Sequence, residues 1–364
     1  MRYRQEHTYC KIWLTGLTMV LCSLFVSCTK EEGVKLEIPH SHELSMVSFT
    51  RSSTLMTQAA ATTVTEDYSP LQVFLVKNGT NENEIVTQSD RFIFRPSENL
   101  WKSKLEITTN TTYAIYGYAP ADAVTAEISG VSLTDTSTGA TLTFSNLPAV
   151  SSQDICFVVG VHQVTTSSPE EDPKSINVTK PITQGIFTFT GNANGNYAHL
   201  LLDHIYAGLC IQASIGTEYA QLRSIKIRKL ELQASKATAT ATIALASNTT
   251  GTSPVQSATY SNLTGEQSSA IFFDSTEGVE LDVTTLREAT CCFVPSLSND
   301  LTLVTTYDVY DKKGNKIAER TATNKLPNLT AARGQRVNLA LKIEPTYLGV
   351  LSDKDLDDPT VVVN

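Results

Sequence analysis

Alternating apolar and polar positions run through most of the chain and predict β-strands. In RVNLALKIEP every second residue from Val337 to Ile343 is apolar, and Ile225 and Ile227 alternate with polar neighbours in the same way. TYDVYDKKGNKIAE predicts a hairpin around Gly314 and Asn315. The other predicted strands are short and separated by Asn, Gly, Ser, Thr and Pro: LQVFLV, RFIF, TYAIYGYAP, ICFVVGV, IFTFT, IYAGLCIQ, TATATIALA and LTLVTTYDVY.

Helical patterns are scarce, and residues 217–223 form the best short candidate. Many short strands without long helices favour antiparallel β-sandwiches over a parallel sheet with crossover helices. A chain of 364 residues suggests about two domains, and GNANGN at 191–196 is the strongest boundary signal. We therefore expect an all-β protein with two tandem antiparallel β-sandwich domains, residues 52–192 and 193–345.

The first 27 residues are predicted to be an export signal. Arg2, Arg4 and Lys11 precede IWLTGLTMVLCSLFVS, a run of 16 residues without a charge. That run is short for a membrane span, which needs about 20 residues. The segment is therefore interpreted as an export signal that is removed, and not as part of the fold.

The end of this signal resembles the lipobox of bacterial lipoproteins, because LFVS precedes Cys28. At a lipobox the thiol is diacylated and the chain is cut, here between Ser27 and Cys28. The polar stretch TKEEG that follows suits a flexible tether, and two or three acyl chains such as palmitate anchor a protein stably in a membrane. The alternative is an ordinary signal peptide in which Cys28 is incidental.

Composition narrows the class of protein and of partner. Apolar residues make up 41% and charged residues 18% of the chain, which is typical of an ordered globular protein. The formal net charge is −9 at pH 7. An acidic surface argues against nucleic acid and anionic lipid as ligands.

The seven cysteines do not predict a disulfide framework. Cys10 and Cys22 lie in the signal, and Cys28 is the acylation candidate. Buried structural thiols are favoured over disulfides for the others because their contexts are apolar. These four are Cys156, Cys210, Cys291 and Cys292.

Arg51 is isolated in the segment SMVSFTRSS, since no other Lys or Arg occurs between Lys35 and Lys77. VKLEI before Pro39 and MVSFT before Arg51 both alternate in polarity, so residues 28–51 offer two short strands that could cover a sandwich. Arg51 is therefore interpreted as a unique cleavage site for a protease. The alternative is a solvated surface residue whose isolation is chance.

The C-terminal 19 residues, 346–364, have a similar two-part form: TYLGVL, an acidic DKDLDDP, and TVVVN. A strand left free at a terminus invites edge pairing with another chain. We therefore expect this appendage to be either tucked in or meant for a partner. Its apolar anchors are Tyr347, Leu348, Val350, Leu351, Val361, Val362 and Val363.

Catalytic and metal-binding patterns are not found. There is no GxSxG, HExxH or GxxxxGK[ST], and no CxxC or Cys/His spacing suggests a metal. His40 and His42 could pair on a metal but lie in the segment proposed for removal. His199 and His204 are expected to be satisfied sheet residues, and Asp203 beside His204 is not a dyad without a nucleophile. We expect no enzyme activity, no catalytic residues, no cofactor and no metal.

These features together resemble the fimbrillin family of type V pili of Bacteroidia. The resemblance rests on the signal ending at Cys28, the lone Arg51, the segments TYAIYGYAP and LLLDHIYAGLCIQASI, and the ending from LPNLTAARGQ onward. It implies transthyretin-like topology in both sandwiches, and a lipoprotein precursor in the outer membrane that becomes part of a cell-surface fimbrium. It also implies that a trypsin-like surface protease cuts between Arg51 and Ser52 and removes residues 28–51.

The groove opened by this cut would be filled by a strand of another copy or a related pilin, with residues 346–364 as the candidate donor. An appendage of this kind favours a stalk subunit that contributes to adhesion. The alternatives are an anchor or tip accessory of the same pilus, or a monomeric lipoprotein adhesin. In an adhesin that binds glycans, Tyr113, Tyr116 and Tyr118 could stack on sugars, although such tyrosines more often pack within sheets.

Overall fold

The computed structural model describes residues 43–51, 70–80, 84–134, 137–176, 183–248, 252–284, 287–326, 329–344 and 360–363. The chain divides into Met1–Pro39 and His40–Asn364, and all described residues belong to the second unit. Several predictions fall outside the described residues: the export signal with Ser27 and Cys28, the strand before Pro39, Ser52, and the anchors Tyr347, Leu348, Val350 and Leu351.

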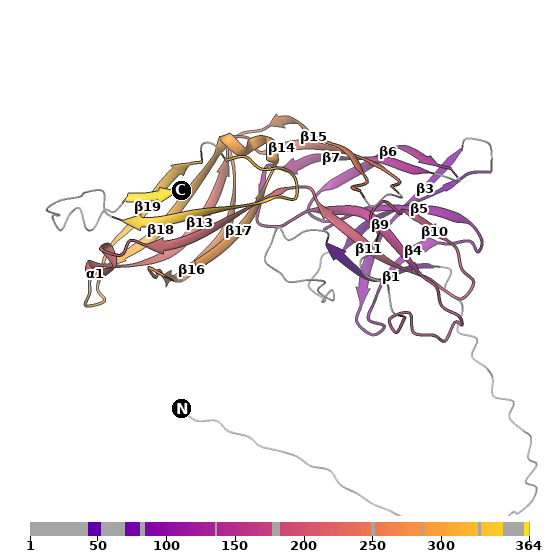
Figure 1. Ribbon diagram of the computed structural model, residues 1–364, viewed down its shortest axis with the longest axis horizontal. Helices are drawn as coiled ribbons and strands as arrows, with labels where there is room; N and C mark the ends of the chain where they lie inside the picture. The colour runs from indigo at the N-terminus through magenta and orange to yellow at the C-terminus, as the bar shows by residue number, and fades with distance from the viewer. Residues whose placement is uncertain are drawn as a thin grey trace, which may run out of the picture. The chain divides into compact units, whose positions relative to one another are not determined.

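The described part of the chain is almost entirely β-structure, which confirms the predicted all-β class (Figure 1). The arrangement as two tandem sandwiches stays a prediction. The largest sheet has eight strands in the order β10-β5-β2-β3-β4-β1-β11-β9, and a further pairing of β5 with β9 joins the sheet back to itself. Its strands are β1 (Glu43–Arg51), β2 (Leu71–Asn78), β3 (Ile85–Arg95), β4 (Leu100–Glu106), β5 (Thr112–Ala119), β9 (Cys156–Val164), β10 (Thr188–Thr190) and β11 (Asn196–His204).

Three smaller sheets complete the fold, in the orders β21-β20-β12-β17-β8, β16-β13-β18-β19 and β15-β14-β7-β6. Their strands are β6 (Thr125–Leu133), β7 (Thr138–Pro148), β8 (Val150–Ser151), β12 (Ala207–Ile215), β13 (Ser224–Ala234), β14 (Thr238–Ala246), β15 (Val255–Thr264), β16 (Ser268–Glu280), β17 (Arg287–Phe293), β18 (Leu301–Tyr310), β19 (Lys316–Lys325), β20 (Arg336–Glu344) and β21 (Thr360–Val363).

Strands from the two halves of the sequence share sheets. β11 lies beyond the predicted junction at 192/193 but pairs with β1 and β9, and β7 pairs with β14 along the registers Ala239↔Leu147 to Ala246↔Gly139. The domain ranges 52–192 and 193–345, and the transthyretin-like topology, stay predictions.

Local patterns account for the type of each element. In β14 every second residue of TATATIALA is buried, so alternation in sequence becomes one buried face. β5 is instead buried on both faces, and it approaches β2 so closely that a β-carbon at Gly117 would clash with the backbone oxygen of Gln72. The segment TYAIYGYA therefore lacks polar alternation because neither of its faces meets water.

The predicted hairpin and the predicted short helix are both present. β18 and β19 pair antiparallel around a turn in which Gly314 has a φ of +85°, and Oδ1 of Asp311 accepts hydrogen bonds from the backbone of Lys313 and Asn315 at 2.8 Å. The helix α1 covers Tyr219–Leu222. No helix within the described ranges has the length and apolar character needed to cross a membrane.

The four cysteines that follow residue 51 are buried, as predicted. Across the described residues no disulfide joins them. Each lies in or at the start of a sheet strand, in β9, β12 or β17.

A buried carboxylate on β18 makes two ion pairs that hold the β13-β18-β19 sheet together. Asp308 Oδ1 lies 2.8 Å from Lys316 Nζ, and Oδ2 lies 3.1 Å from Arg228 Nη1. Burial alone would raise the pKa of Asp308, but the hydrogen bonds and charges of Lys316 and Arg228 together outweigh it and lower the pKa. Ionised Asp308 therefore favours the folded state.

Substituting Asp308→Asn is expected to lower the free energy of unfolding by about 2 kcal/mol at neutral pH. Because the folded state has the lower pKa, this contribution is complete above the ordinary pKa of aspartate and is lost as the pH falls through the folded value. Urea unfolding of wild type and variant at several pH values should show the difference shrinking with acidification. Asp274→Asn, at an exposed position on β16 of the same sheet, should show little difference. A D308N deficit that persists undiminished in acid would contradict the assignment.

Candidate strand-exchange site

The segment before Arg51 lies in the interior of the largest sheet, between β4 and β11 (Figure 1). β1 runs antiparallel to β4 and parallel to β11, with its register shifted between Met46 and Ser48 on the β11 side. We call the place that residues 43–51 occupy between β4 and β11 the β1 slot. An emptied slot would leave the facing edges of both strands without this partner.

Apolar burial holds the first half of β1 in the slot. Leu44 and Met46 have no exposed surface and belong to the same buried cluster as Trp101, Leu105 and Leu200. Burying two such side chains contributes roughly 3 to 6 kcal/mol. β1 is therefore a component of this core as well as of the sheet.

Two polar contacts fix the position of β1 along the slot. Ser103 Oγ on β4 donates to the backbone oxygen of Leu44 at 2.9 Å, and Ser48 Oγ lies 2.5 Å from Nδ1 of His199 on β11. The ring of His162 on β9 lies 6.4 Å from that of His199. His199 was expected to be hydrogen-bonded within a sheet. The partner of its Nδ1 is Ser48 of β1, the strand proposed for removal.

Arg51 is the last residue of β1, and its backbone pairs with Leu202 of β11. The predicted scissile bond to Ser52 follows directly after the paired strand. A cut at that bond would separate all of β1 from the chain that continues into β2. The lone arginine therefore stands where a single cut detaches one strand.

The end of the C-terminal appendage is tucked onto the chain's own fold. β21 pairs antiparallel with β20, from Leu341↔Val363 to Glu344↔Thr360, and is the edge strand of its sheet. Val361 is buried, and its backbone oxygen accepts a hydrogen bond from Asn324 Nδ2 at 2.9 Å. The appendage was expected to be either tucked in or meant for a partner. In the single chain, residues 360–363 are tucked in.

The tyrosines suggested for sugar stacking belong to the core, so that role is wrong for them. Tyr113, Tyr116 and Tyr118 are all buried. The ring of Tyr116 lies 5.0 Å from that of Phe187, and Tyr118 meets Phe144 edge-on at 5.4 Å. Burial raises the pKa of Tyr116 to about 12. Both faces of β5 are covered, so these rings are not available to a glycan.

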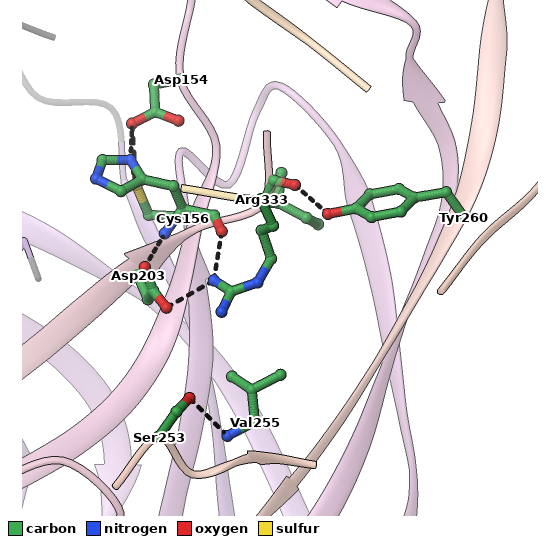
Figure 2. Close-up of polar contacts among 9 residues, drawn as sticks. Asp154, Cys156, Asp203, Ser253, Val255, Tyr260 and Arg333 are labelled. Atoms are coloured by element: carbon green, nitrogen blue, oxygen red, sulfur yellow. Dashed lines mark hydrogen bonds and ion pairs between the residues drawn. The ribbon is translucent and has the colours of Figure 1, made fainter. Parts of the chain in front are cut away.

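A second polar cluster joins the start of β9 to the end of β11 (Figure 2). His204 Nδ1 lies 2.6 Å from Asp154 Oδ2, and Cys156 Sγ lies 3.3 Å from the same oxygen. Asp203 turns to another partner, because Arg333 Nη1 contacts its Oδ2 at 2.6 Å and the backbone oxygen of His204 at 2.7 Å.

Sequence reasoning missed this cluster because its members follow no spacing motif. The pairing of β9 with β11 places His204 opposite Cys156, and Asp154 stands two residues before Cys156. The available signal was an Asp just before one apolar strand, a Cys as the first residue of that strand, and a His at the end of another strand. His204 is hydrogen-bonded as expected: its ring pairs with Asp154, while Asp203 Oδ1 accepts from its backbone N–H at 2.8 Å.

No protein family and no curated protein sequence matches this chain. Among solved structures, the fold is similar to a candidate cell adhesion protein from Bacteroides fragilis (10% identity, 88% of this chain and 97% of that chain, TM-score 0.41). It is also similar to a fimbrial protein from Bacteroides vulgatus (13%, 88% and 98%, TM-score 0.40) and to the fimbrial anchor protein Mfa2 from Porphyromonas gingivalis (9%, 88% and 94%, TM-score 0.26). These similar chains are fimbrial or candidate adhesion proteins of Bacteroidia, the class named from the sequence. Because each of these TM-scores is below 0.5, the function proposed below rests on the geometry of β1.

Proposed function

We propose that this protein is a structural subunit of a cell-surface fimbrium that is activated by cleavage after Arg51 and polymerises by strand exchange. The observation that carries the proposal is the β1 slot: a strand in the middle of a sheet, with Leu44 and Met46 fully buried, ends at an isolated arginine. Before cleavage this strand completes the sheet. After cleavage it is a separate peptide that can leave.

Tethering explains why the cut acts as the switch. A strand on the same chain competes at an effective concentration near the millimolar range, so a strand from another molecule rarely displaces it. Cleavage removes that advantage, and departure of β1 exposes the edges of β4 and β11 to an incoming strand. Backbone pairing would then supply affinity, and the pockets left by Leu44 and Met46 would supply specificity.

The donor in this proposal is the appendage of residues 346–364. Its last strand already pairs as β21 in the single chain, so its segment forms sheet without a partner's help. A subunit with both a slot and a donor can extend a polymer in two directions, which suits a stalk. The precursor would reach the outer membrane through acylated Cys28 and lose that anchor together with residues 28–51.

Substituting Arg51→Gln tests the proposal. Trypsin treatment of the wild-type precursor is expected to yield an N-terminus at Ser52, and the product should form fibres visible by electron microscopy. The variant should stay uncut at this bond and unassembled, because trypsin requires Lys or Arg before the bond. Arg95→Gln is the matched control, since Arg95 also ends a strand and is exposed; it should be processed like wild type.

Assembly of the R51Q variant with β1 still attached would overturn the proposal. So would native surface material that keeps residues 28–51 with an acylated Cys28, which would favour a monomeric lipoprotein adhesin or an anchor subunit instead. Mass spectrometry of the mature N-terminus decides between these outcomes. It needs no knowledge of the natural protease.

A further inference from the structure

Three different metal-ligating groups meet at the junction of β9 and β11. Asp154 Oδ2, Cys156 Sγ and His204 Nδ1 all lie within 4.8 Å of one another, and all three residues are buried. The thiol is 3.3 Å from the carboxylate oxygen and 3.6 Å from the imidazole nitrogen. The mechanism proposed for strand exchange uses none of them.

These separations suit a tetrahedral zinc ion. Zinc binds sulfur at about 2.3 Å and nitrogen or oxygen at about 2.0 to 2.2 Å, which places its ligand atoms about 3.3 to 3.6 Å apart. The two distances from Cys156 already fall in this range. The remaining one, 2.6 Å between His204 and Asp154, is a hydrogen bond that would widen by about 0.7 Å. The three side chains supply three donor atoms, and a water molecule would complete the tetrahedron.

Charge balance also fits a divalent ion. Side chains as deeply buried as these, at 1% and 2% exposure for His204 and Asp154, must be neutral as a group to avoid a large desolvation cost. Zn²⁺ with one thiolate, one carboxylate and one neutral imidazole has no net charge. Soft thiolate and imidazole ligands favour zinc over magnesium or calcium.

We propose that Asp154, Cys156 and His204 form a zinc site with three protein ligands, which ties the start of β9 to the end of β11. Binding would displace the proton of the thiol and the proton shared by His204 and Asp154, so two protons would leave for each ion. Ser152 and Gln153, which directly precede Asp154 in the sequence, are exposed. The site braces β11, the strand that pairs with β1.

Cobalt substitution tests the site in the full-length chain. After removal of bound metal with a chelator, Co²⁺ is expected to produce an absorption band from thiolate-to-cobalt charge transfer, and Zn²⁺ should abolish it at about one equivalent per chain. Cys156→Ala should lose the band. Cys291→Ala, an equally buried thiol in β17, should retain it.

A thermal readout keeps the test decisive if Cys156→Ala folds poorly. Zn²⁺ should raise the unfolding temperature of the wild type but not that of Cys156→Ser or His204→Gln, with folding checked by circular dichroism. Absence of a cobalt band in the wild type would overturn the proposal, and so would a band that survives in Cys156→Ser. Either result would mean that the three groups form only a hydrogen-bonded clamp.

Discussion

Substituting Met46→Asp is expected to lower the free energy of unfolding of the uncleaved protein by about 4 kcal/mol or more. Met46 is fully buried and pairs with Trp101 on one side and Ala198 on the other. Loss of the side chain alone costs about 2 to 5 kcal/mol, as for other Met truncations in cores. The buried carboxylate adds a desolvation cost. Urea unfolding followed by circular dichroism measures the sum.

The control for this substitution lies three residues earlier on the same strand. Glu43 is exposed, so Glu43→Gln should change the free energy of unfolding by less than about 0.5 kcal/mol. Cleavage after Arg51 provides a second control, since Met46 leaves with β1 and the two remaining chains are then identical. Equal urea midpoints for uncleaved M46D and wild type would show that β1 does not fill its slot.

Local sequence was sufficient to predict the class of fold and its simplest elements. Alternation reports that one face of a strand is buried, which is why β13, β14 and the β18-β19 hairpin were predictable. Alternation does not indicate which strands pair with one another. β1 pairs with β11, where Ser48 and His199 are 151 positions apart, and β11 is buried along nearly its whole length. β7 pairs with β14, and both alternate in the same way as many other strands.

The candidate site was predictable only where composition marks it. Arg51 stands out because its neighbourhood lacks other basic residues, and the C-terminal valines stand out because they follow an acidic spacer. Nothing marks His199 or Ser103, since their roles arise from contact with β1. Asp154 and His204 are likewise joined by strand pairing across 50 positions, a distance that no local motif spans.

Removing residues 346–364 is expected to abolish fibre formation while leaving a folded, cleavable subunit. The truncation removes β21, an edge strand whose buried anchor is Val361, and this loss should cost about 2 kcal/mol of stability. The β1 slot is untouched, so cleavage after Arg51 should still release β1. Light scattering and electron microscopy of the cleaved protein measure the missing assembly, and circular dichroism checks the fold.

The cleaved truncated subunit should also act as a chain terminator. It has an open slot but no donor, so it accepts a strand from a growing polymer and offers none in return. Adding it to cleaved full-length protein should therefore shorten fibres in proportion to its molar fraction. The same truncated chain with Arg51→Gln keeps β1 in its slot and should have no effect, which separates capping from dilution. Fibres of unchanged length in the first mixture, or fibres of the truncated chain alone, would show that residues 346–364 are not the donor and that β21 is simply the edge of its own sheet.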